Sequence, residues 1–129
     1  VIHSQALYAA SRYRRLQRWL RNPKVDPQAI YGPLIRAALS KWKEVRVYVA
    51  LDTTVLWNKF VIIRASLVYR GRAIPLAWKV LRHASASVAF ADYAPVLRQA
   101  ARLLPADWEV TFLADRGFCD EELFPLLKE

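Results

Sequence analysis

The chain has 129 residues, of which 55% are hydrophobic and three are glycine, and its single cysteine is Cys119. This composition is too apolar for a disordered chain, and no uninterrupted apolar run reaches the roughly 18 residues that a membrane-spanning helix requires. One cysteine forms neither an internal disulfide nor a metal-ligand cluster. We therefore expect a soluble globular protein in a reducing compartment, without an export signal and without a membrane partner.

The formal net charge of +9 is concentrated near the N-terminus. Residues 1–46 contain ten Lys or Arg and two acidic residues, whereas residues 47–129 contain ten and nine. The stretch SRYRRLQRWLRN spaces Tyr13, Leu16 and Leu20 along one face of a helix. The other faces carry arginines, namely Arg12, Arg14, Arg15, Arg18 and Arg21. Such a helix is either a solvated charged surface or a binding surface, for a polyanion such as DNA or for an acidic protein or membrane surface.

A second helix is predicted from Pro27 to about Ser40, because Asp26 suits the N-cap and proline suits the first helical position. Pro33 inside this stretch removes a backbone donor and favours a kink or an interruption. Residues 1–43 are therefore expected to form a basic helical segment that precedes the rest of the fold.

Residues 44–129 are expected to form an α/β domain. The β-branched and aromatic residues of 45–81 predict a meander of three strands, and 92–104 predict a helix. Residues 108–115 predict a fourth strand, and a last helix is predicted to begin after Asp120 as its N-cap. The resulting order is βββαβα.

The first and fourth predicted strands both end on an aspartate, Asp52 and Asp115. A strand, helix, strand crossover normally places its strands parallel, so the fourth strand can lie beside the first, at a spacing of ~4.8 Å. Two carboxylates that close favour a divalent cation with oxygen ligands, Mg²⁺ or Mn²⁺, and such ions serve phosphodiester chemistry. Alternatively, each aspartate simply forms a turn or a helix cap.

Three stretches resemble the catalytic region of bacterial insertion-sequence DDE transposases, in the insertion-sequence-four group. They are VALDTTVLW with Asp52, the hairpin FVIIRASLVYRGRAIPLAWKVL, and FLADRGFCDEEL with Asp115. The resemblance covers most of the chain, including the basic segment. It implies an RNase H-like mixed sheet, here incomplete, in which Asp52 and Asp115 are the first two catalytic acids and metal ligands. It also implies Mg²⁺ as the cofactor, which Mn²⁺ can usually replace.

The resemblance further implies DNA transposition, in which hydrolysis of a phosphodiester frees a 3′-hydroxyl that attacks target DNA. The implied partners are double-stranded DNA at the transposon ends and at the target, and a second copy of the chain in a homodimeric DNA complex. The implied location is the bacterial cytoplasm, at the nucleoid when DNA is bound. Arg116 beside Asp115 suits either a DNA phosphate or a nearby carboxylate.

The third acid of the triad is missing from its expected motif, which is Tyr, two residues, Arg, three residues, Glu. Tyr69 and Arg72 have this spacing, but Leu76 stands at the Glu position. Glu121 and Glu122 lie at the start of the last predicted helix, where they favour the helix dipole over metal binding. We therefore expect a transposase fragment that is inactive alone. The alternative is a DNA-binding remnant of a transposase without catalytic function.

Overall fold

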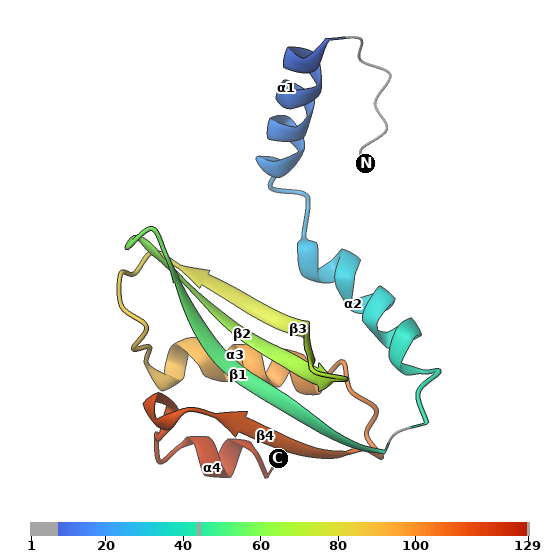
Figure 1. The fold of residues 1–129 in the computed structure, drawn as a ribbon, viewed down its shortest axis with the longest axis vertical. Coiled ribbons are helices and arrows are strands. Elements are labelled where there is room, and N and C mark those ends of the chain that lie inside the picture. Colours follow the sequence, from blue (N-terminus) through green and yellow to red (C-terminus); the bar gives the residue numbers. More distant parts are fainter. Residues whose placement is uncertain (1–7, 44, 129) are drawn as a thin grey trace. The chain divides into compact units, whose positions relative to one another are not determined.

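The computed structural model describes residues 8–43 and 45–128 (Figure 1). The chain divides into two compact units, residues 1–31 and residues 32–129. The boundary that the sequence predicts, between a basic helical segment and the rest, stays a prediction. No helix in the described part of the chain is both long enough and apolar enough to cross a membrane.

The first two elements are helices, as the sequence predicts. Helix α1 spans Ala9–Leu20, and none of its residues is buried. Helix α2 spans Pro27–Leu39, and it starts in the first unit and ends in the second. The Asp26 carboxylate accepts a hydrogen bond from the backbone N–H of Gln28 at 2.9 Å, which confirms the predicted N-cap. Pro33 lies inside α2 and does not interrupt it.

The second unit contains a mixed sheet of four strands in the order β3-β2-β1-β4. The first three strands pair antiparallel, whereas β4 pairs parallel with β1, so the predicted meander and the predicted crossover are both confirmed. The elements are β1 (Arg46–Leu56), β2 (Phe60–Tyr69), β3 (Arg72–Leu81), α3 (Phe90–Ala101), β4 (Glu109–Ala114), a 3₁₀ turn (Arg116–Phe118) and α4 (Leu123–Leu126). The protein is therefore an α/β protein with two N-terminal helices.

One face of the sheet carries the core. Helix α3 lies behind the sheet in the view of Figure 1, and its buried side chains are Tyr93, Ala94, Val96, Leu97 and Ala100. Alternate residues of β1 and β2 meet them, and those buried are Val47, Val49, Leu51, Val61, Ile63, Ala65 and Leu67. This alternation is what the period of two residues in a strand requires when one face is covered.

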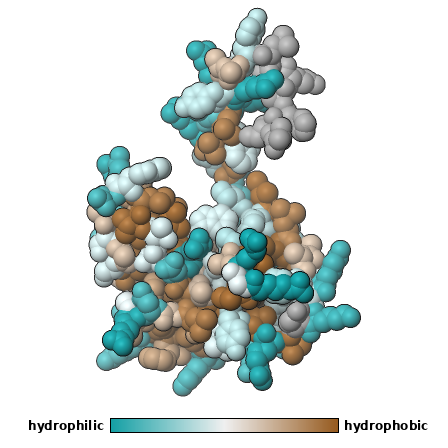
Figure 2. Space-filling view, in the orientation of Figure 1, coloured by the Kyte–Doolittle hydropathy of each residue, from teal (hydrophilic) through white to brown (hydrophobic). Residues whose placement is uncertain are grey.

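The opposite face of the sheet, which we call the open face, is partly exposed. It presents large apolar side chains that are 38% to 55% exposed, namely Tyr48, Val68, Val80 and Leu113. Figure 2 shows apolar side chains mixed with hydrophilic ones over the part of the surface that contains the sheet. The described helices that follow the meander thus cover one face of the sheet and leave the other accessible.

The prediction that the first strand ends at Asp52 is wrong, because β1 continues to Leu56. The residues after Asp52 include Thr53, Thr54 and Val55, whose branched side chains favour the extended backbone, and all three pair with β2. The strand ends only at the following turn. Asp52 therefore lies within the strand, one residue beyond Leu51, where the pairing of β1 with β4 ends.

Candidate functional site

Asp52 and Asp115 come from neighbouring parallel strands. The last paired row of β1 and β4 joins Leu51 to Ala114, and Asp115 continues in an extended conformation, with φ −77° and ψ 176°. Leu51 and Ala114 are opposite one another and belong to the covered face. Because successive side chains alternate between the two faces of a sheet, the next residues, Asp52 and Asp115, are expected on the open face. Both residues are exposed. Neighbouring strands are ~4.8 Å apart, so the backbones of Asp52 and Asp115 come close to one another. Asp115 also borders a hollow on the α3 side, with Leu51, Leu97 and Phe112.

Each of these carboxylates also has a partner within the chain. Oδ1 of Asp115 accepts a hydrogen bond from the backbone N–H of Gly117 at 2.8 Å, so this aspartate caps the 3₁₀ turn. Oδ2 of Asp52 lies 3.8 Å from Nη2 of Arg64, which is directly opposite it on β2. Asp115 thus forms a turn, as aspartates at strand ends often do. The hydrogen bond of this turn uses Oδ1, and Oδ2 does not take part in it.

A divalent cation fits this pair in its donor chemistry. Two exposed carboxylates on one face offer the hard oxygen ligands that Mg²⁺ prefers, and Mg²⁺ normally completes its shell with water and phosphate oxygens. Within residues 8–43 and 45–128, no group of three His, Cys, Asp or Glu residues could hold a metal ion. Glu121 and Glu122 therefore do not join Asp52 and Asp115 as a third ligand in this arrangement. Both glutamates are exposed just before α4.

The basic residues predicted to contact DNA fall in two places. Arg14, Arg18 and Arg21 line a single shallow hollow along α1, together with Ser11 and Gln17. The neighbouring arginines Arg12 and Arg15 belong to the same helix and are exposed. Arg116 is exposed in the 3₁₀ turn directly after Asp115. The helical spacing thus gathers three guanidinium groups on one side of α1, as a phosphate-binding surface requires.

Tyr93 is a residue of this region that the sequence pattern assigns only to the core. Its side chain is fully buried in α3, and its hydroxyl donates a hydrogen bond to Oδ2 of Asp120. Its ring meets those of Phe90 and Phe118 edge to face, at centroid distances of 5.4 Å and 5.2 Å. Phe118 is the last residue of the 3₁₀ turn that follows Asp115. By packing against Phe118, Tyr93 stabilises this turn on the covered side of the sheet.

The partner of Asp120 corrects a second prediction. The sequence predicts that Asp120 caps the last helix, but α4 begins at Leu123, and its N-cap position is Glu122. The Asp120 side chain instead accepts the hydrogen bond from Tyr93. A contact across 27 residues of sequence thus replaces the local cap.

Removing the Tyr93 hydroxyl is expected to change how stability depends on pH. Burial, and secondarily the hydrogen bond to Asp120, raise the pKa of Tyr93 above its usual value of about 10. A raised pKa means that the folded chain favours the protonated hydroxyl. This stabilisation is complete below about pH 10 and is lost as the pH rises further.

We expect Tyr93→Phe to lower the free energy of unfolding by about 1 to 2 kcal/mol near pH 8, because it removes a hydrogen bond to a carboxylate. Above about pH 10 the difference between the parent and the variant should shrink. Urea denaturation of both proteins at pH 8 and at pH 10.5 measures this. Parallel pH profiles for the two proteins would show that the hydroxyl is not held in its protonated form by the fold.

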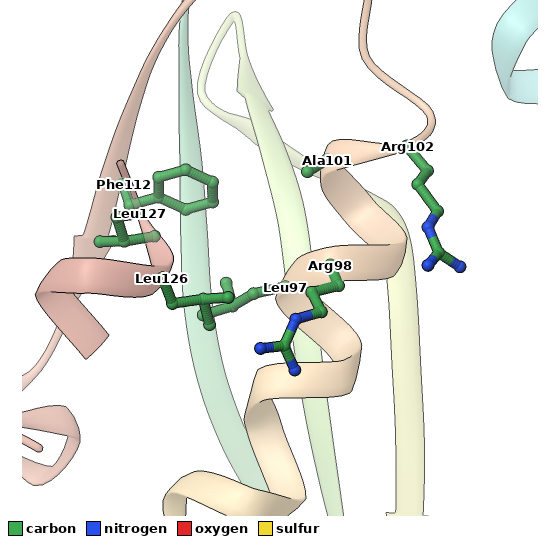
Figure 3. Close-up of a pocket in the computed structure, with 7 residues that line it drawn as sticks. All are labelled: Leu97, Arg98, Ala101, Arg102, Phe112, Leu126 and Leu127. Atoms are coloured by element: carbon green, nitrogen blue, oxygen red, sulfur yellow. The ribbon is translucent and has the colours of Figure 1, made fainter. Parts of the chain in front are cut away.

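Another hollow lies on the covered side of the sheet, between α3 and α4, and has a volume of about 300 Å³ (Figure 3). It is lined by Leu97, Arg98, Ala101, Arg102, Phe112, Leu126 and Leu127. Its walls are mainly apolar, and it contains no carboxylate. Phe112 points to the covered face, whereas the neighbouring Leu113 points to the open face with Asp115. Asp115 does not line this hollow, but it lines a neighbouring hollow of about 220 Å³ that shares Leu97, Phe112 and Leu127 with it.

Comparisons with protein-family models, with curated proteins and with solved structures find no match to this chain.

Proposed function

We propose that this chain is part of a metal-dependent DNA transposase of the DDE type, with an RNase H-like catalytic domain that starts at β1. One observation supports this proposal most directly: Asp52 and Asp115 each come one residue after Leu51 and Ala114, the last paired row of two neighbouring parallel strands, and both residues are exposed. The strand order, with β1 between an antiparallel β2 and a parallel β4, is also consistent with it.

In this proposal Asp52 and Asp115 hold Mg²⁺, or Mn²⁺ in its place, through carboxylate oxygens. When bound, such an ion activates the attacking oxygen and stabilises the leaving oxygen of a phosphodiester. The N–H of Gly117 orients Asp115 through its 2.8 Å hydrogen bond. Arg116, next in the chain, is exposed and suits a flanking phosphate. The reaction proposed is hydrolysis that frees a 3′-hydroxyl, followed by strand transfer.

The proposed substrate is double-stranded DNA at transposon ends and at a target site, bound by a homodimer in the bacterial cytoplasm. The basic helix α1 contacts the phosphate backbone through Arg14, Arg18 and Arg21, and Arg12 and Arg15 add positive charge beside them. Because DDE chemistry needs three acids and no group of three possible ligands lies among the described residues, the proposal also requires a third carboxylate from outside the described residues.

The second candidate function is DNA binding without catalysis. Two observations favour it. The described residues contain no group of three acids that could hold a metal ion, and Asp115 already caps the 3₁₀ turn. Both candidates predict DNA binding, but only the first predicts a divalent cation at the carboxylate pair. Metal binding is therefore the measurement that separates them.

Manganese binding tests the carboxylate pair directly. We expect the parent chain to bind Mn²⁺ and Asp52→Asn or Asp115→Asn to weaken this binding at least about tenfold, because each removes a charged oxygen ligand. Titration of the free-Mn²⁺ signal in electron paramagnetic resonance measures the affinity. Asp107→Asn is the matched control, since Asp107 is an exposed aspartate in the loop before β4. Equal affinity in all four proteins would favour the non-catalytic candidate.

The salt dependence of DNA binding tests the basic helix. Each phosphate that is neutralised contributes about −0.9 to the slope of log K against log salt concentration. The double variant Arg14→Ala/Arg18→Ala should therefore have a slope shallower by about two, which fluorescence anisotropy with a labelled duplex can measure. Arg98→Ala/Arg102→Ala has the same change of charge and the same spacing, at the last turn and the C-cap of α3, and it should leave the slope unchanged. A parent slope near zero would reject DNA binding by the helix.

A further inference from the structure

Arg64 occupies a special position relative to the proposed site. It is the β2 residue directly opposite Asp52, and Asp115 follows in the same row on the other side of Asp52. All three side chains share the open face, because they lie in one row across neighbouring strands. The guanidinium group is thus a positive charge that the sheet itself supplies beside Asp52. Its side chain is half-exposed, at 41%.

The ion pair between Arg64 and Asp52 is loose. Its shortest N to O distance is 3.8 Å, whereas a hydrogen bond between a guanidinium and a carboxylate measures about 2.7 to 2.9 Å. Arg46 on β1 and Glu109 on β4 form a closer ion pair, with 2.9 Å between Nε and Oε2. Arg64 makes no other hydrogen bond or ion pair with the described residues. Most of its five N–H donors are therefore available to another oxygen-rich group.

We propose that Arg64 binds a phosphate of the DNA strand beside the carboxylate pair, and that Asp52 restrains Arg64 until DNA arrives. This inference rests on the proposed function, because it takes DNA as the ligand of the open face. A guanidinium suits a phosphate better than a single carboxylate at 3.8 Å does, since its planar fork can donate two parallel hydrogen bonds. Arg64 then fixes the strand in the row that also contains Asp52 and Asp115.

Binding of a 30-base-pair duplex of arbitrary sequence, in EDTA, tests this inference without any metal or catalysis. Arg64→Gln should weaken binding by about tenfold, the value of a charge-assisted hydrogen bond, and reduce the salt slope by about one. Asp52→Asn should tighten binding about two- to fivefold, because it releases Arg64 from an exposed ion pair. Arg64→Lys, which keeps the charge and loses the fork, should fall between the parent and Arg64→Gln.

The double variant Asp52→Asn/Arg64→Gln separates release of Arg64 from a general loss of negative charge. If Asp52 acts by restraining Arg64, Asp52→Asn should have no effect when Arg64 is already replaced. Glu109→Gln removes the same charge from the Arg46 pair on the same face, and it should change the affinity less than twofold. Circular dichroism of each variant verifies that the fold is retained.

The outcomes distinguish this inference from the function on which it rests. If the parent binds DNA and the Arg14 and Arg18 substitutions reduce its salt slope, but Arg64→Gln has no effect, the inference is wrong and the proposed function stands. If Asp52→Asn tightens binding equally with and without Arg64, the restraint by Asp52 is wrong. If the parent binds no DNA at all, the inference and the proposed function fall together.

Discussion

If the proposed transposase function is correct, Asp52→Asn should abolish metal-dependent DNA cleavage. The substitution keeps the size and the backbone pairing of the residue, and it removes the charge that a divalent cation requires. Replacement of groups that only orient a metal ligand costs 10- to 100-fold, so loss of a ligand itself should cost about a hundredfold or more. The assay is nicking of a DNA duplex in Mg²⁺, and the expressed protein should include any coding sequence that follows residue 129.

The control for this experiment is Asp107→Asn, which makes the same chemical change at an exposed loop position. It should nick at the rate of the parent. Equal nicking by the parent and by Asp52→Asn, or none by either protein, would count against the enzymatic proposal. In the second case, retained DNA binding would leave the non-catalytic candidate as the better account.

Leu67→Ala should have the largest effect on folding. Leu67 is fully buried in β2, and it pairs with Val49 on one side and with Ile74 on the other. Removing its branched end leaves a cavity between the sheet and α3, and such substitutions cost about 2 to 5 kcal/mol. Domains are stable by only about 5 to 15 kcal/mol, so this change should lower the urea midpoint greatly or prevent folding.

The adjacent position provides the matched control. Val68 belongs to the same strand but points to the open face, where 38% of it is exposed. Val68→Ala should cost less than about 1 kcal/mol, because little buried surface is lost. Similar losses of stability in the two variants would mean that the open face is covered in solution by another part of the protein or by a second copy.

Most of the sheet could be predicted from local patterns. Branched and aromatic residues indicated the strands, and the crossover rule gave the parallel pairing of the first and fourth strands. The sequence does not predict the full length of β1, because an aspartate such as Asp52 favours a strand end. The turn instead lies at Trp57 and Asn58, both with positive φ. Asn is one of the few non-glycine residues that tolerate this conformation, so Asn58 was the local signal for the turn.

The role of Arg64 required this same turn. Once Leu56 pairs with Phe60 across the turn, the antiparallel register fixes Arg64 opposite Asp52. Once the turn is located, the sequence therefore predicts that the guanidinium group of Arg64 lies beside Asp52. The contact between Tyr93 and Asp120 had no such signal, because it depends on how α3 packs against the turn after β4. The arginines of α1, by contrast, needed only helical spacing.

The parallel pairing of β1 with β4 also bears on how fast the chain folds. Arg46 and Glu109 are 63 residues apart, whereas the hairpin partners Tyr48 and Val68 are much nearer in sequence. Closing the longer loop costs more entropy, so we expect the two hairpins to form first and β4 to join later. Asp52 and Asp115 then meet only in the final stage of folding. Any ligand that bridges them should slow the departure of β4, and it should raise the melting temperature in proportion to the logarithm of its concentration.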